Sequence, residues 1–178
     1  MTLAEIVLPS SQMLRALIIA AASLAVLAAV WVLQEFGYQP CELCLTQRYA
    51  FYAAAPLALL TAFVASRRAP GVARALFWLL AAVFLANAAL AAYHAGVEYR
   101  WWPGPTACAG GLTGSVDVND LVKALDSARV VRCDEVQLRI AGLSLAGWNV
   151  AASAALAVYA SLAARLWHSH SEVRAISA

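Results

Sequence analysis

The sequence predicts an all-α integral membrane protein, a four-transmembrane-helix bundle with two loops on its outer face, the second carrying a short amphipathic helix. Three observations predict it: the composition, four long apolar stretches, and the placement of arginine and cysteine. Hydrophobic residues make up 63% of the chain and charged residues 12%, against roughly 45–50% and about 25% in ordinary soluble proteins. A soluble domain of 178 residues has too little interior to bury so much apolar surface, so the expected solvent is lipid.

Each of the four apolar stretches approaches the ~20 residues that a helix needs to cross a ~30 Å hydrocarbon core. We predict transmembrane helices at about 14–33, 45–65, 75–95 and 143–164. Pro56 in the second stretch indicates a kink, or a start before Tyr49, where the apolar run begins.

The first stretch has a second interpretation, a cleaved signal peptide. Its apolar region is longer than the 7–15 residues usual in such peptides. It also ends in Trp31-Val32-Leu33, with no small-residue cleavage site. These features favour a membrane helix.

Arginine predicts the orientation of the bundle, because cytoplasmic loops carry an excess of Lys and Arg. Arginines gather in the connection between the second and third stretches and in the two flanks of the bundle. They are Arg15, Arg67, Arg68, Arg74, Arg165 and Arg174. The loop at about 34–44 contains neither Lys nor Arg, and the longer loop at about 96–142 mixes basic with acidic residues. We expect one membrane domain over residues 1–178 of a bacterial inner-membrane protein, with cytoplasmic termini and both of these loops periplasmic.

Nucleic-acid binding is not expected. The net charge is only +2, and the chain has no basic run and no glycine-rich loop that would bind phosphate.

All four cysteines fall in the two outer loops, Cys41 and Cys44 in the first and Cys108 and Cys133 in the second. Disulfides persist in the compartment that such loops face. A zinc site, two structural disulfides and a redox relay are the competing interpretations. Zinc sites favour closely spaced cysteine pairs or a cysteine pair with a histidine pair, so no metal is expected. A structural disulfide explains the second pair but not the first, which closes too short a ring to stabilise the fold much.

The C-x-x-C pair has the surroundings of reactive thiols, because a thiolate is favoured at a helix N-terminus or beside a cation. Pro40 precedes the pair, and the second predicted helix starts just after it. Arg48 follows Cys44 by one helical turn, so the two side chains share a face and the guanidinium can stabilise a thiolate. The alternative is that Arg48 only extends to the lipid head groups.

Taken together, these motifs resemble the DsbB disulfide bond formation proteins. The resemblance rests on Pro40-Cys41-Glu42-Leu43-Cys44-Leu45-Thr46-Gln47-Arg48, Tyr93-His94-Ala95-Gly96-Val97-Glu98, Trp102-Pro103-Gly104-Pro105 before Cys108, Cys133-Asp134-Glu135, and Gly142-Leu143-Ser144-Leu145-Ala146-Gly147-Trp148-Asn149. A lone C-x-x-C is a weak signal, whereas this order within four apolar stretches is specific.

The resemblance implies a thiol:quinone oxidoreductase that drives disulfide formation. Cys108–Cys133 would exchange with a reduced DsbA-like thioredoxin-fold partner, Cys108 being the sulfur attacked. Cys133 would pass electrons to Cys41, and Cys44 would reduce a membrane quinone, ubiquinone or menaquinone, with Arg48 beside it.

Two further residues are expected to contact the quinone. Gln47 can hydrogen-bond a quinone carbonyl, and His94 lies about where the family carries a histidine near the quinone. Each is otherwise an ordinary polar residue of the membrane interface. Glu98 is expected to face water, the alternative being that it assists proton delivery. Asn87 and Asn149 are expected to form hydrogen bonds between helices.

The second loop is predicted to contain the amphipathic helix. Asp117 or Asn119 would begin it, and its apolar face would contain Leu121, Val122, Leu125 and Ala128. This helix would rest on the bilayer surface or pack on the loop itself.

Two other functions are alternatives. A quinone reductase of the vitamin K epoxide reductase type also has four cysteines, but there the loop cysteines precede the C-x-x-C. A structural membrane subunit with ordinary stabilising disulfides is the second alternative.

Overall fold

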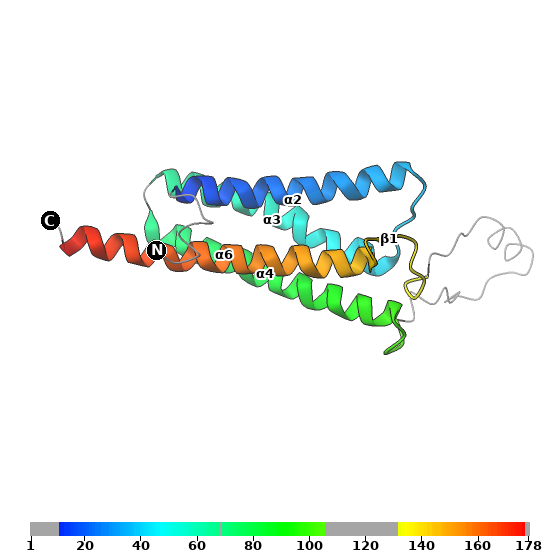
Figure 1. The fold of residues 1–178 in the computed structure, drawn as a ribbon. Coiled ribbons are helices and arrows are strands. Elements are labelled where there is room, and N and C mark those ends of the chain that lie inside the picture. The colour runs from blue at the N-terminus through cyan, green and yellow to red at the C-terminus, as the bar shows by residue number, and fades with distance from the viewer. Residues whose placement is uncertain (1–10, 68, 106–131, 177–178) are drawn as a thin grey trace, which may run out of the picture.

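The computed structural model describes residues 11–67, 69–105 and 132–176, with side chains up to Leu166 (Figure 1). The predicted amphipathic helix, with Asp117 or Asn119 at its start, lies outside the described residues. Cys108 also lies outside them.

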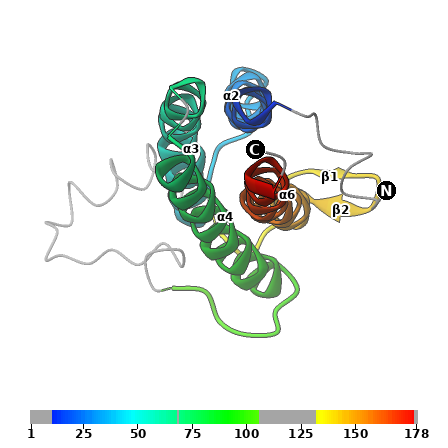
Figure 2. The same cartoon turned by 90° about the vertical axis from the view of Figure 1, so that its left-hand side faces the viewer.

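Four long helices make an antiparallel bundle (Figures 1 and 2). They are α2 (Gln12–Glu35), α3 (Glu42–Ser66), α4 (Pro70–Glu98) and α6 (Leu145–Ile176). Each contains a segment long and apolar enough to cross a membrane, which confirms the predicted fold class. The main packing pairs are α4 with α6 and α2 with α3, and α3 and α4 join the two pairs. Of the helices that are neighbours around the bundle, α2 and α6 contact each other least.

All four helices start at other positions than predicted, and α2 begins at Gln12 instead of about 14. α3 begins at Glu42 instead of about 45, because Cys41 caps its first turn, so Cys44 lies inside the helix and not in the preceding loop. α4 begins at Pro70 instead of about 75, since proline suits the first turn of a helix. α6 begins at Leu145 because residues 143–144 form a strand.

That strand belongs to a small hairpin that the sequence did not predict (Figure 2). β1 (Arg139–Ile140) pairs antiparallel with β2 (Leu143–Ser144). Both turn residues have positive φ, 50° at Ala141 and 84° at Gly142, as in the two-residue turns whose twist matches paired strands. The hairpin leads directly into α6, because the backbone N–H of Gly147 donates to Ser144 Oγ at 3.1 Å and so caps the helix start.

The interior of the bundle is built from small residues around a few phenylalanines. Alanines fill the helix contacts, and Phe51 packs against Phe84 with ring centroids 5.8 Å apart. Large apolar side chains point outward instead; Leu85, for example, is 66% exposed. Small residues between helices and large apolar ones outside are what a lipid solvent favours.

The two ends of the bundle differ in chemistry. One end of the bundle, on the right in Figure 1, contains the end of α2, the start of α3 and the hairpin. We call it the cysteine end, because Cys41, Cys44 and Cys133 lie there. Arg67 follows α3 at the opposite end, and Arg74 lies in the first turns of α4.

The C-terminal turn of α4 is closed by an aromatic contact that depends on Gly96. Trp102 stacks on Tyr93 with centroids 5.9 Å apart and donates from Nε1 to the Tyr93 carbonyl at 2.9 Å. A Cβ added to Gly96 would lie 2.0 Å from the Trp102 ring.

We therefore expect Gly96→Ala to lower the free energy of unfolding by about 1–3 kcal/mol, because it overpacks this contact. Thermal unfolding in detergent, followed by tryptophan fluorescence, measures the effect. Gly71→Ala is the matched control, since no atom lies within 4 Å of an added Cβ there. Equal effects of the two substitutions would count against the packing account.

Candidate functional site

The C-x-x-C pair lies at the N-terminus of α3. Cys41 is the N-cap, and its Sγ accepts a hydrogen bond from the backbone N–H of Cys44 at 3.4 Å. The two sulfurs share a hydrogen bond at 3.0 Å and both are free thiols. The partial positive charge at a helix N-terminus favours a thiolate at this position.

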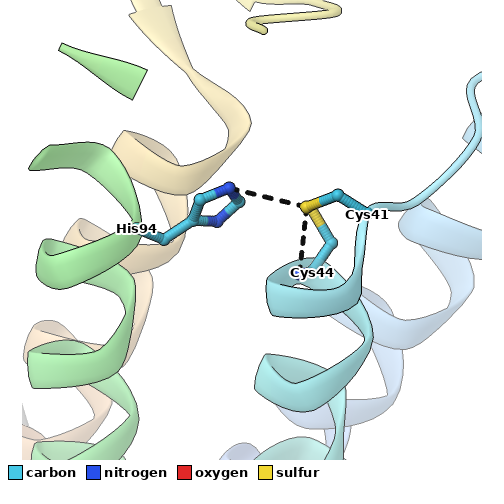
Figure 3. Close-up of side chains that lie close together, drawn as sticks. All are labelled: Cys41, Cys44 and His94. Carbon is cyan, nitrogen blue, oxygen red and sulfur yellow. Dashed lines mark hydrogen bonds between the residues drawn. The ribbon is translucent and has the colours of Figure 1, made fainter. Parts of the chain in front are cut away.

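His94 reaches the pair from α4 (Figure 3). Its Nε2 lies 3.5 Å from Cys41 Sγ, although the two residues are 53 positions apart in the chain. The imidazole is only 2% exposed, and Cys41 is also buried. The predicted histidine therefore faces a sulfur atom in this structure.

When Cys41 is deprotonated, three neighbouring groups can donate to its sulfur: the Cys44 thiol, the Cys44 backbone N–H and the His94 imidazole. The hydrogen bond from Cys44, helped by His94, lowers the pKa of Cys41 to about 4, although burial opposes the shift. The reduced pair is thus best described as a Cys41 thiolate and a Cys44 thiol. The sequence had suggested Cys44 as the thiolate.

This arrangement predicts how the reduced protein responds to pH. The folded-state pKa of Cys41 lies below that of an unfolded cysteine, so the thiolate stabilises the fold at neutral pH and loses this effect as the pH falls through about 4. We expect the ultraviolet absorbance of the thiolate to persist in mildly acidic buffer and to disappear near pH 4. Cys41→Ser should lack this transition. A transition near ~8.5, as in a free thiol, would contradict the account.

Gln47 of α3 is hydrogen-bonded to His94. It is buried, and its Nε2 lies 2.9 Å from His94 Nδ1. An amide N–H at Nδ1 makes that nitrogen the acceptor and leaves the ring proton on Nε2, facing Cys41. The two predicted quinone contacts, Gln47 and His94, therefore bond to each other.

The same geometry bears on metal binding. The donor atoms of Cys41, Cys44 and His94 lie within 4.8 Å of one another, close enough to share an ion. A histidine ligand must present a lone pair, whereas Nε2 presents a proton here while Gln47 donates to Nδ1. The arrangement favours a thiol pair over a metal centre.

A cavity of about 390 Å³ adjoins the pair, between α2 and α6 where these helices pack least. Its apolar wall on α2 consists of Val26, Leu27, Ala29, Val30 and Leu33. Its polar lining includes Cys44, Gln47, Arg48, His94, Glu98 and Asn149, and residues of both loops complete it. Of the two thiols, Cys44 is the one that lines the cavity.

Arg48 lies at this cavity and makes a hydrogen bond to α2. Its Nη1 donates to Gln34 Oε1, so the guanidinium is directed across the cavity and is partly buried. No hydrogen bond or ion pair joins Arg48 to Cys44 among the described residues. The predicted cooperation of Arg48 with Cys44 stays a prediction.

Glu98 corrects an expectation, because it does not simply face water. Its carboxylate is half-buried, lines the cavity and accepts a hydrogen bond from Ser144 Oγ. Ser144 was not predicted from the sequence as a site residue. A serine just before an apolar helix is a recognisable N-cap signal, but its second role depends on the hairpin.

Cys133 brings the second loop to the first. It is disulfide-bonded, and only 1% of it is exposed. It belongs to one buried cluster with Cys41, Leu43 and Val97. Nearby, Gln137 Nε2 donates to the carbonyl of Gln39 at 2.7 Å and ties the loops together. Three of the four predicted redox cysteines therefore lie close together, and Cys108 is outside the described residues.

Comparison with known protein families places the chain in one of them. The family model described as disulfide bond formation protein DsbB matches residues 12–163. The match covers the first three helical spans and all but the last three residues of the fourth, Leu145–Leu166. No curated protein and no solved structure matches the chain.

Proposed function

Because the chain belongs to the DsbB family of disulfide bond formation proteins, we propose that it is a quinone-dependent thiol oxidase that reoxidises a DsbA-like dithiol protein. One observation carries the proposal: the reduced Cys41–Cys44 pair lies between the disulfide of Cys133 and a cavity inside a membrane bundle. Such a pair is placed to receive electrons on one side and to release them on the other.

The two sulfurs of the pair have different neighbours, which suggests their order in the relay. Cys41 is a buried member of the cluster that contains Cys133, whereas Cys44 is only partly buried and packs against that cluster, so we assign Cys41 as the sulfur that the Cys133 thiolate would attack when the first pair is oxidised. Cys44 lines the cavity and would deliver the electrons there. The outer pair, Cys108 and Cys133, would itself be reduced by the partner, whose two thiols become a disulfide.

The cavity suits a quinone. Ligand cavities are mostly apolar with a few well-placed polar groups, and this one has an apolar wall on α2 opposite Cys44 and Arg48. A bound quinone would accept two electrons and two protons from this site. The Cys41 thiolate and Cys44 thiol together supply both electrons but only one proton. The second proton must come from another acid or from water. Glu98, which lines the same cavity, is such an acid.

The positions of the arginines support an orientation of the bundle in the membrane. Arg67 and Arg74 lie at the end opposite the cysteines, and cytoplasmic loops are the ones enriched in such residues. We place the cysteine end in the periplasm, where a DsbA-like partner would meet it, and both termini in the cytoplasm.

Turnover with a partner tests the function. Purified protein is mixed with a reduced thioredoxin-fold dithiol and a soluble ubiquinone analogue, and the loss of quinone absorbance is followed. We expect quinone consumption to match the disulfides formed in the partner, one for one. Consumption no faster than in a protein-free mixture would refute the proposal.

A further inference from the structure

A line of polar side chains, all buried except the half-buried Asn149, crosses the bundle and ends at the redox pair. It starts at Asn87 on α4, whose Nδ2 donates to Ser153 Oγ on α6 at 2.9 Å. Ser153 Oγ donates to Asn149 Oδ1 at 3.2 Å, one turn earlier on α6. Asn149 Nδ2 in turn donates to Gln47 Oε1 on α3, and Gln47 bonds His94. Hydrogen bonds between helices, predicted for both asparagines, therefore exist and form one chain.

The donor and the acceptor of each hydrogen bond in this series are determined by the bond before it. Because Asn149 Oδ1 accepts from Ser153, its amide nitrogen is the group left to face Gln47. Because Gln47 Oε1 accepts from Asn149, its own nitrogen must face His94 Nδ1. Reversing one amide alone would bring two donors or two acceptors together in a buried place, which is costly.

We infer that Asn149 is a positioning residue of the thiol site: through Gln47 it holds the His94 imidazole with its Nε2–H directed at the Cys41 sulfur. The inference deepens the proposed function, since it explains how a residue on α6 sets the state of a pair on α3. Asn149 lies 102 residues from Gln47 in the chain and does not need to touch either sulfur to act.

Loss of Asn149 has a definite consequence. Gln47 can then turn its amide and present Oε1 to His94, which moves the ring proton from Nε2 to Nδ1. Nε2 would then present a lone pair to the Cys41 sulfur, so it could no longer donate a hydrogen bond to the thiolate. The other titratable groups around Cys41 are Cys44 on α3 and Glu98 on α4, while Cys133 is held in its disulfide.

Long-range proton–nitrogen NMR of the reduced protein in detergent tests the inference, because the imidazole nitrogen shifts identify which nitrogen carries the proton. His94→Gln assigns the His94 signal. Ultraviolet titration of the thiolate is the second readout. Neither needs a quinone or a partner, so failure here is distinguishable from failure of the proposed function.

Asn149→Leu is the main variant. Ser153→Ala is a milder one, which removes the donor to Asn149 Oδ1 and the acceptor of the Asn87 amide but leaves Asn149 itself in place. The matched control is Ser161→Ala on the same helix, whose hydroxyl bonds only its own helix at Ala157 O. We expect wild type and control to show the Nε2–H form. Asn149→Leu should show the Nδ1–H form and raise the midpoint of the thiolate titration by about one pH unit, with Ser153→Ala shifting less in the same direction.

The inference would be overturned if both Asn149→Leu and Ser153→Ala kept the wild-type tautomer of His94 and the wild-type midpoint of the thiolate titration. If Asn149→Leu fails to fold, Ser153→Ala decides alone, because a wild-type tautomer in that variant has the same meaning.

Discussion

Cys44→Ser abolishes quinone reduction and leaves the bundle folded. Cys44 is the thiol that lines the cavity, and a serine hydroxyl cannot take part in thiol–disulfide chemistry. Loss of an essential nucleophile commonly costs several orders of magnitude in turnover, so we expect a decrease of at least ~10³-fold. The fold should survive, because Cys41 still caps α3 and the backbone N–H of residue 44 is unchanged.

Turnover with reduced partner and quinone measures the loss, and thermal unfolding in detergent measures the fold. Thr46→Val is the matched control, since its exposed hydroxyl bonds only the Glu42 carbonyl of its own helix, at 3.0 Å. A structural membrane subunit would behave differently, with lower stability in Cys44→Ser and no quinone activity to lose. Full activity in Cys44→Ser would remove Cys44 from the mechanism.

Cys133→Ser is expected to separate the two halves of the relay. Without Cys133 the outer pair cannot form, so oxidation of a protein partner should fall to the uncatalysed rate. The inner pair and the cavity remain, so quinone reduction should continue when a small dithiol reduces Cys41–Cys44 directly.

Paired assays check this, one with a reduced thioredoxin-fold protein and one with dithiothreitol as the electron donor. Wild type should use both donors, and Cys133→Ser only the small one. Efficient oxidation of the protein partner by a folded Cys133→Ser variant would show that electrons bypass the outer pair.

The membrane bundle could be predicted from sequence because its signals are local. The length of each apolar stretch determines a spanning helix, whatever the neighbouring helices are. The start of α3 was placed three residues late, since the apolar pattern begins only after the capping residue. Cysteine is not among the usual N-caps, so Cys41 gave no start signal.

The arrangement around the thiols was harder to predict, because it depends on how helices are rotated against one another. Gln47 was selected as a quinone contact, but its bond to His94 joins residues 47 positions apart on different helices. The contact between Asn149 and Gln47 spans 102 positions. No periodicity within one helix identifies such pairs. Glu98 was misjudged for the same reason, since Ser144 reaches it only through the hairpin.

The central claim is that Cys41 and Cys44 pass their electrons directly to a quinone. A single turnover without oxygen tests it: fully reduced protein is mixed with one equivalent of a ubiquinone analogue, and free thiols are then alkylated and located by mass spectrometry. We predict one quinol per protein, formed at the rate at which Cys41 and Cys44 together become protected from alkylation. Quinol formation while both thiols stay free, or oxidation of the pair with no quinol formed, would contradict the account.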